Sequence, residues 1–170
     1  ENSCNPGFVD VAMKLGKDRF MKYIKGFGFG ETTGIDLPGE ARGLIDPSKV
    51  GPVELATISF GQGISVTPIQ LISAFATVAN DGKMVQPHVA KAVTDKDGKI
   101  VQEFSFEPLR QVISYDTAQE MKMILESVVT NGTGGKGKIE GYRVGGKTGT
   151  AEKYSPGKYV VSYAGFAPCD

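Results

Sequence analysis

Hydrophobic residues recur at helical spacing near the start of the chain, which predicts two helices. The first is expected directly after residues 5–7, and a second, shorter helix over residues 18–24 ends at Gly26. One face of the first helix carries Phe8, Val11, Ala12 and Leu15. Residues 27–46 are rich in Gly and Pro and predict a loop, with one extended stretch at residues 35–37.

The clearest helix is predicted to begin at Thr67. Thr67 is a favourable N-cap residue, Pro68 suits the first helical position, and Gln70 stands where a capping box requires it. Apolar residues then repeat at helical spacing at Leu71, Ile72, Phe75, Ala76 and Ala79. Residues 80–82, Asn-Asp-Gly, are expected to end this helix.

A last helix is predicted from Ser114 to just before residues 131–132. Its buried side is expected to consist of Ala118, Met121, Ile124, Leu125 and Val128. The Met and Phe side chains on the predicted helices are interpreted as core, because they fall into the same helical pattern.

Two hairpins are predicted in the second half of the chain. Strands at residues 89–94 and 99–104 flank Asp-Lys-Asp-Gly at residues 95–98, a turn sequence whose alternating charges indicate a solvated face. Strands at residues 144–152 and 159–167 form the second hairpin. Helices that precede an antiparallel sheet indicate the α+β class.

The composition excludes some classes of function. Lys plus Arg equals Asp plus Glu at 19 each, which gives no reason to expect a nucleic-acid partner. Cys4, Cys169 and His88 are too few to build a metal site, and no cofactor is expected. His88 is interpreted as structural. The chain has no initiator Met, opens with a polar Glu-Asn-Ser and stops just after an apolar run, so we expect it to be part of a longer protein. It has no apolar run of transmembrane length.

The strongest chemical signal lies on the predicted strand at residues 146–151. Lys147 supplies a cation, Thr148 and Thr150 carry hydroxyls that can donate to a carboxylate, and Gly149 leaves room for ligand backbone. Together they suit an extended peptide with a carboxylate, bound by strand addition. A bare Lys-Thr-Gly also fits an ordinary solvated strand with a turn glycine.

The second signal is Ser3-Cys4-Asn5. Alone, a Ser-x-Asn triplet usually forms a turn or an N-cap. Followed by Lys-Thr-Gly, it completes two of the three motifs of class A β-lactamases and penicillin-binding proteins, whose third motif is Ser-x-x-Lys. Cys4 is the variable middle position, and we expect it to be a small buried spacer without chemistry.

Longer segments extend the resemblance. Residues 60–70 are similar to the segment that leads into a long helix in class B penicillin-binding proteins, and residues 79–82 and 86–88 continue the likeness. Residues 34–40 and 128–134 resemble further parts of the same enzymes. The resemblance covers nearly all 170 residues and leaves open a sporulation, division or elongation role.

The resemblance implies the chemistry of a peptidoglycan D,D-transpeptidase. In that family a serine of Ser-x-x-Lys attacks the penultimate D-alanine carbonyl of a stem peptide and forms an acyl-enzyme, and β-lactams acylate the same serine. The implied fold is a partial penicillin-binding-protein or serine β-lactamase-like transpeptidase fold over residues 1–170. It would lack the Ser-x-x-Lys helix and the final strand and helix.

The resemblance also assigns roles to residues of the two motifs. Ser3 would relay a proton, Asn5 would bind the substrate amide and orient the catalytic lysine, and Lys147 would supply positive potential. Thr148 and Thr150 would hold the terminal carboxylate. The backbone N–H of Thr150 would form half of an oxyanion hole, and Gly149 would let the substrate lie along the strand.

The chain departs from the family pattern at the nucleophile. Its single formal Ser-x-x-Lys match is Ser155-Pro156-Gly157-Lys158, where Pro-Gly predicts a turn instead of the helical turn that the motif needs. We therefore expect the serine to lie before Glu1. The chain alone is expected neither to cross-link peptides nor to be labelled covalently by penicillin.

The sequence leaves two other functions open and suggests partners for the longer protein. A serine β-lactamase and a non-catalytic peptide-binding or scaffold module both stay open. The expected partners of the longer protein are stem peptides ending in D-Ala-D-Ala, β-lactams and a glycan-polymerising protein, and an open sheet edge would allow dimerisation. The expected location is the bacterial cell membrane, with the catalytic domain outside the cytoplasm.

Overall fold

The computed structural model describes residues 1–153, 155 and 157–169, and within them the predicted α+β class is confirmed. The helices are α1 (Asn5–Leu15), α2 (Lys17–Gly26), α3 (Pro52–Ser59), α4 (Pro68–Ala79) and α5 (Tyr115–Asn131), with 3-10 turns η1 (Pro47–Lys49) and η2 (Gly135–Gly137). The strands are β1 (Lys83–Met84), β2 (Ala92–Thr94), β3 (Ile100–Glu103), β4 (Arg110–Gln111), β5 (Gly145–Glu152) and β6 (Tyr159–Phe166).

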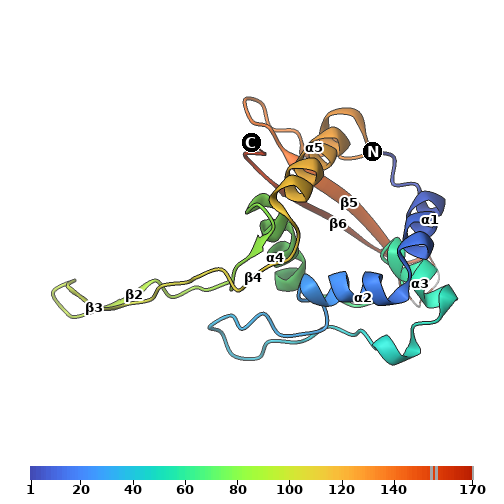
Figure 1. Ribbon diagram of the computed structural model, residues 1–170. Coiled ribbons are helices and arrows are strands. Elements are labelled where there is room, and N and C mark those ends of the chain that lie inside the picture. The colour runs from blue at the N-terminus through green and yellow to red at the C-terminus, as the bar shows by residue number, and fades with distance from the viewer. Residues whose placement is uncertain (154, 156, 170) are drawn as a thin grey trace.

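The strands of the described residues form three antiparallel pairs, β1 with β4, β2 with β3 and β5 with β6. The β5–β6 hairpin runs in unbroken register from Gly145 opposite Phe166 to Glu152 opposite Tyr159. It crosses the molecule between α5 and α3, as Figure 1 shows. Helix α5 packs along β5, and α4 contacts both α5 and β6, so the two helices together pack against the hairpin.

The predicted capping box of α4 is present. Thr67 Oγ1 accepts a hydrogen bond from the backbone N–H of Gln70 at 3.2 Å, and Gln70 Oε1 accepts one from Thr67 N–H at 2.9 Å. Gln70 is only 1% exposed, and its amide nitrogen donates to the carbonyl oxygens of Glu31 and Arg42. One side chain therefore starts α4 and fastens the preceding loop to it.

A small apolar cluster joins the first three helices. It consists of Ala12, Val50, Leu55 and Ile58, with Phe20, Met21, Ile24 and Ile64 packed around it. Helix α3 was not predicted from the sequence, because its eight residues are too few for a clear periodic pattern, although Gly51 and Pro52 mark its start. None of the helices in the described residues is long and apolar enough to cross a membrane.

The interpretation of the helix Met and Phe residues as core is wrong at several positions. Phe8, Met13 and Met123 are exposed, and Ile124, predicted on the buried side of α5, is 52% exposed. The buried residues of α5 are Ala118, Lys122, Leu125, Val128 and Val129. Ile124 lies about 100° around the helix from Leu125, so it falls outside the face that meets β5.

The extended stretch predicted at residues 35–37 joins no strand. Instead, the Asp36 carboxylate accepts hydrogen bonds from the backbone N–H groups of Val89 and Ala90, at 2.7 and 2.8 Å. This ties the loop to the root of the β2–β3 hairpin, which projects from the body as an arm of residues 85–109 (Figure 1). At the same root, the ring of His88 stacks on Phe106 with 3.4 Å between centroids.

A partly buried ion pair connects the end of α4 to the middle of α5. Lys122 is 6% exposed, and its Nζ donates to Asp81 Oδ1 at 2.9 Å, which also accepts a hydrogen bond from Gln119. The hydrogen bond from Lys122 is the main reason that the pKa of Asp81 lies below its ordinary value. The pattern-based prediction placed only apolar residues on this face.

Replacing Thr67 by Ala removes the N-cap acceptor of α4. We expect Thr67→Ala to lower the free energy of unfolding by about 1 kcal/mol, measured by urea denaturation. Thr94→Ala, at an exposed position of β2, is the matched control and should change it by less than about 0.5 kcal/mol. Equal losses in both variants would show that the cap contributes nothing.

The pH dependence of stability should report the Asp81–Lys122 pair. Because the folded-state pKa of Asp81 is lowered from 3.8, the pair stabilises the fold above that value, and the stabilisation is lost as pH falls through the folded pKa. Asp81→Asn should lower the urea midpoint near pH 7, and the difference from the unsubstituted chain should shrink toward about pH 2. Asp97→Asn, at the tip of the arm, is the control. A difference that does not change with pH would contradict this account.

Candidate active site

The centre of the site is strand β5, which carries the predicted residues 147–150. These pair in register with residues 161–164 of β6, and within the described residues the other edge of β5 is unpaired. An unpaired edge offers backbone N–H and C=O groups to an extended peptide. A Cβ at Gly149 would lie 2.7 Å from Ser162 Oγ, so the neighbouring strand also favours glycine there.

Ser3 and Lys147 meet although 144 residues separate them. Lys147 Nζ donates to Ser3 Oγ at 3.0 Å and to the carbonyl oxygen of Thr148 at 2.6 Å. Ser3 has a φ of 53°, a left-handed conformation that is uncommon for a residue other than glycine. This backbone turn leads directly into α1, whose N-cap residue is Cys4.

Lys147 carries its charge in partly buried surroundings. Burial lowers the pKa of Lys147, because desolvation disfavours the ammonium form. No carboxylate forms an ion pair with it in the part of the chain that the structure describes. A partly desolvated cation without an acidic partner is suited to attract an anionic group of a ligand.

Thr133 is a site residue that the sequence reasoning missed. Its hydroxyl lies 3.1 Å from the hydroxyl of Thr148, and its backbone N–H donates to the carbonyl oxygen of Glu1 at 3.3 Å. Ser127 Oγ donates to the Glu1 carboxylate, which further fixes the amino-terminal segment to α5. A hydroxyl between Gly132 and Gly134, directly after a helix, was the signal that could have revealed it.

The remaining predicted catalytic residues are Asn5 and Thr150. Asn5 is the first residue of α1, and Thr150 is exposed on β5. Among the described residues, no side-chain hydrogen bond joins either of them to Ser3, Lys147 or Thr148. The expectation that Cys4 is a buried spacer is wrong, because Cys4 is an exposed free thiol where the chain turns into α1.

The formal Ser-x-x-Lys match lies in the turn between β5 and β6. Lys158 N–H donates to the carbonyl oxygen of Ser155 at 3.2 Å, and Gly157 has a φ of 75°. Pro156 lies outside the described residues. Ser155 and Lys158 therefore do not stand on a helix, which agrees with the prediction from sequence.

Comparisons with known proteins give one family. The model of the penicillin binding protein transpeptidase domain matches residues 1–170. Stage V sporulation protein D of Bacillus subtilis is 51% identical over all of this chain and 27% of that protein, which confirms the resemblance to penicillin-binding proteins expected from the sequence. Peptidoglycan D,D-transpeptidase FtsI of Escherichia coli is 33% identical over 99% of this chain and 28% of that protein.

Solved structures agree with the sequence relatives. Penicillin binding protein 3 of Mycobacterium tuberculosis in complex with ampicillin superposes with a TM-score of 0.89 and 32% identity, over 99% of this chain and 40% of that chain. The chain spans about 27% of the length of stage V sporulation protein D. Because the family model matches the whole chain, this chain belongs to the penicillin-binding protein transpeptidase domain family.

Proposed function

We propose that the protein to which this chain belongs is a peptidoglycan D,D-transpeptidase that cross-links stem peptides through an acyl-serine intermediate. The observation that carries the proposal is the 3.0 Å contact between Ser3 Oγ and Lys147 Nζ. It joins the Ser-x-Asn and Lys-Thr-Gly motifs beside a strand with an unpaired edge. Relatives named as peptidoglycan D,D-transpeptidases support the same chemistry.

Each motif residue has a role in this proposal. Lys147 attracts the substrate carboxylate and, through Ser3, passes a proton to the leaving amine and takes one from the incoming amine. Thr148 and Thr150 donate hydrogen bonds to that carboxylate, and Thr133 orients the Thr148 hydroxyl. The backbone N–H of Thr150 stabilises the oxyanion, a contribution of about 3 kcal/mol for one donor.

The Asn5 side chain binds the peptide backbone of the substrate and orients the catalytic lysine of the missing motif. Gly149 keeps the strand surface free of side chains where the substrate lies. Both roles are carried over from the family, onto positions that the fold places at the start of α1 and in β5.

The nucleophile belongs to sequence outside these 170 residues. The chain covers 40% of the solved relative that contains ampicillin, which leaves ample length for a helical Ser-x-x-Lys. Residues 1–170 then form the carboxy-terminal part of the transpeptidase domain, and a final strand and helix complete it. An open sheet edge in the isolated chain would allow dimerisation.

The proposed protein acts on the outer side of the bacterial cell membrane, to which it is anchored. Its substrates are stem peptides that end in D-Ala-D-Ala, its inhibitors are β-lactams, and it works beside a glycan-polymerising protein. The 51% identity to stage V sporulation protein D favours a role in sporulation.

Labelling with a fluorescent penicillin tests this function. The 170-residue chain should give no covalent band, and a longer protein that includes the upstream Ser-x-x-Lys should give one that unlabelled penicillin abolishes. In the longer protein, Lys147→Ala should slow acylation by about 10²–10⁴-fold, because proton transfer and carboxylate binding are both impaired.

Lys99→Ala, at an exposed position on the arm, is the matched control for this experiment and should leave the acylation rate unchanged. A stoichiometric, competable band on the 170-residue chain would refute the missing nucleophile. An unchanged acylation rate in Lys147→Ala would refute the role of the Lys-Thr-Gly strand.

A further inference from the structure

A hollow lies away from the motif residues, between the end of α2 and strand β4. Its volume is about 490 Å³, within the range of small-ligand sites. The polar side chains that line it include Lys22, Tyr23, Lys25, Glu31 and Arg110. None of the residues assigned to the transpeptidase site is among its lining residues, so its function can be tested separately.

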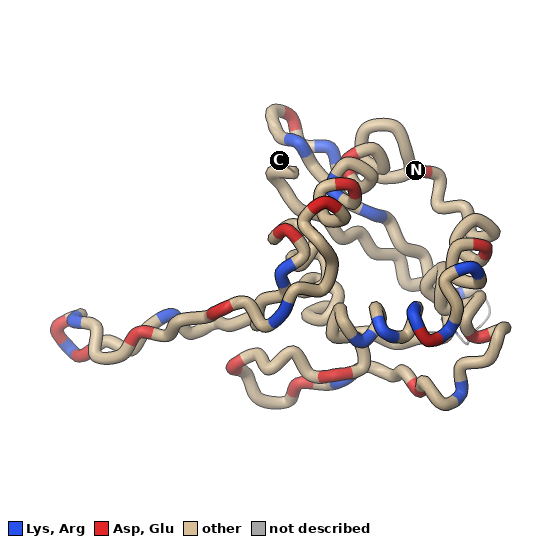
Figure 2. The backbone as a smooth tube through the Cα atoms, in the orientation of Figure 1, with Lys and Arg blue, Asp and Glu red and all other residues tan. Residues whose placement is uncertain are grey.

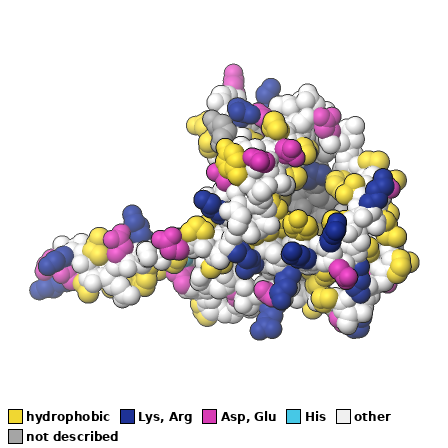
Figure 3. Space-filling model, in the orientation of Figure 1, with side chains coloured by type: hydrophobic (Ala, Val, Ile, Leu, Met, Phe, Trp, Pro, Cys, Tyr) yellow, Lys and Arg dark blue, Asp and Glu magenta, His cyan; other side chains and the backbone are white. Residues whose placement is uncertain are grey.

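This hollow, a cleft between α2 and β4, carries a local excess of positive charge, although the net charge of the chain is zero. Helix α2 carries four basic residues and one acidic residue, Asp18, although the whole chain has 19 of each sign. Figure 2 shows this basic stretch along α2, and Figure 3 shows Lys and Arg side chains gathered on this face. Among the residues that line the cleft, Lys22, Lys25 and Arg110 are basic and Glu31 alone is acidic, which leaves an excess of two positive charges.

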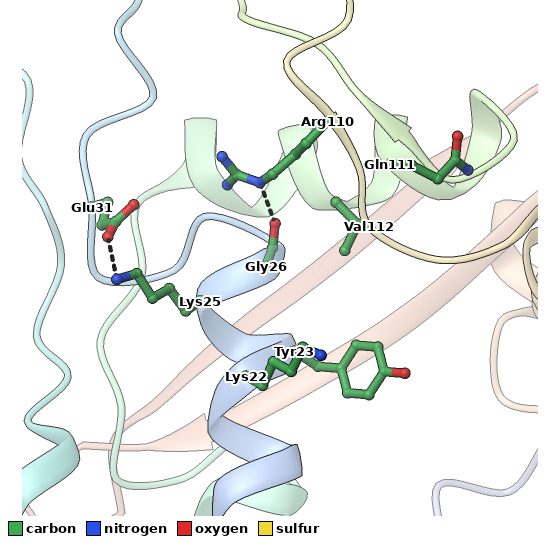
Figure 4. A pocket seen from close by; sticks show the side chains of 8 residues that line it. All are labelled: Lys22, Tyr23, Lys25, Gly26, Glu31, Arg110, Gln111 and Val112. Atoms are coloured by element: carbon green, nitrogen blue, oxygen red, sulfur yellow. Dashed lines mark hydrogen bonds and ion pairs between the residues drawn. The ribbon is translucent and has the colours of Figure 1, made fainter.

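The three cations keep hydrogen-bonding capacity for a ligand. Arg110 donates its Nε–H to the carbonyl oxygen of Gly26 at 3.0 Å, which fixes the guanidinium at the end of α2 and uses one of its five N–H groups (Figure 4). Lys25 Nζ lies 3.6 Å from Glu31 Oε1, a loose pair between exposed side chains. Within the described residues, Lys22 has neither an ion pair nor a side-chain hydrogen bond.

We propose that this cleft binds a phosphate-bearing anion with at least two negative charges, such as a diphosphate. A guanidinium held at one nitrogen and two flexible ammonium groups suit phosphate oxygens, which accept charge-assisted hydrogen bonds from several donors at once. A single carboxylate would balance only one of the two excess charges. Tyr23 adds a hydroxyl donor from the same helix.

Calorimetric titration of the 170-residue chain with inorganic pyrophosphate at low salt tests the proposal. We expect saturable binding that weakens as salt is added. Lys22→Ala combined with Lys25→Ala should weaken it by about tenfold or more, since each lost charge-assisted hydrogen bond costs enough for such a change. Both lysines are exposed, so the variant should keep its fold, which circular dichroism checks.

Two further variants sharpen the test. Glu31→Gln removes the competing carboxylate and releases Lys25, so it should tighten pyrophosphate binding. Lys96→Ala combined with Lys99→Ala, in the exposed arm, removes the same charge elsewhere and should leave the affinity unchanged. Equal losses in the α2 and arm variants would mean that only net charge matters and would overturn the site.

Vesicles distinguish the source of the phosphate. Binding to phosphatidylglycerol vesicles but not to phosphatidylcholine vesicles, lost in the Lys22, Lys25 variant, would assign the cleft to a lipid headgroup. Binding of pyrophosphate alone would assign it to a soluble diphosphate. Saturable binding of neither probe, or cleft-dependent binding of an oligoglutamate peptide in place of both, would overturn the proposal.

Discussion

The hydrogen bond between Ser3 and Lys147 is the constraint on which the candidate site depends. It is made by the amino-terminal turn and by a strand near the other end of the chain, so the whole intervening fold must bring them together. Lys147 is fixed by the register of β5 and β6, and Ser3 is fixed because Glu1 is bound by Thr133 and Ser127. Helix α5 packs along β5 and also leads into the Thr133 loop, so it positions both partners.

The electrostatics of this contact explain its fitness for binding an anion. Lys147 is partly desolvated, and its neighbours in the described residues are hydroxyl and carbonyl oxygens instead of carboxylates. A carboxylate partner would satisfy the ammonium and compete with substrate. By contrast, Lys122 is more deeply buried and is neutralised by Asp81, as expected of a structural pair. These two lysines thus differ in their partners: a carboxylate for Lys122, and hydroxyl and carbonyl oxygens for Lys147.

Local signals in the sequence predicted the elements that have strong local chemistry. Thr67, Pro68 and Gln70 predicted the start of α4, because a capping box is satisfied within four residues. The Asp-Gly turn at residues 97–98 and the β5–β6 hairpin were likewise predicted from short stretches of sequence. Strands β1 and β4 were not, since two residues each give no periodicity, and their pairing depends on the chain between them.

Tertiary contacts decided what the sequence could not predict. Ile124 and Leu125 have similar hydrophobicity, and only the packing of α5 on β5 exposes the first and buries the second. The same holds for Cys4, which became exposed because the chain turns at Ser3. Family resemblance assigned the motif residues Ser3 and Lys147 roles in one active site, whereas Thr133 belongs to no motif and was found only from its contact with Thr148.

A double-mutant cycle on unfolding free energy, with Ser3→Ala, Lys147→Met and both together, measures the central contact most directly. If the hydrogen bond forms as described, the two substitutions should be coupled by about 1 kcal/mol, because the first loss removes the partner of the second. Additive effects, with no coupling beyond the error of the measurement, would show that Ser3 and Lys147 do not meet and would contradict the account.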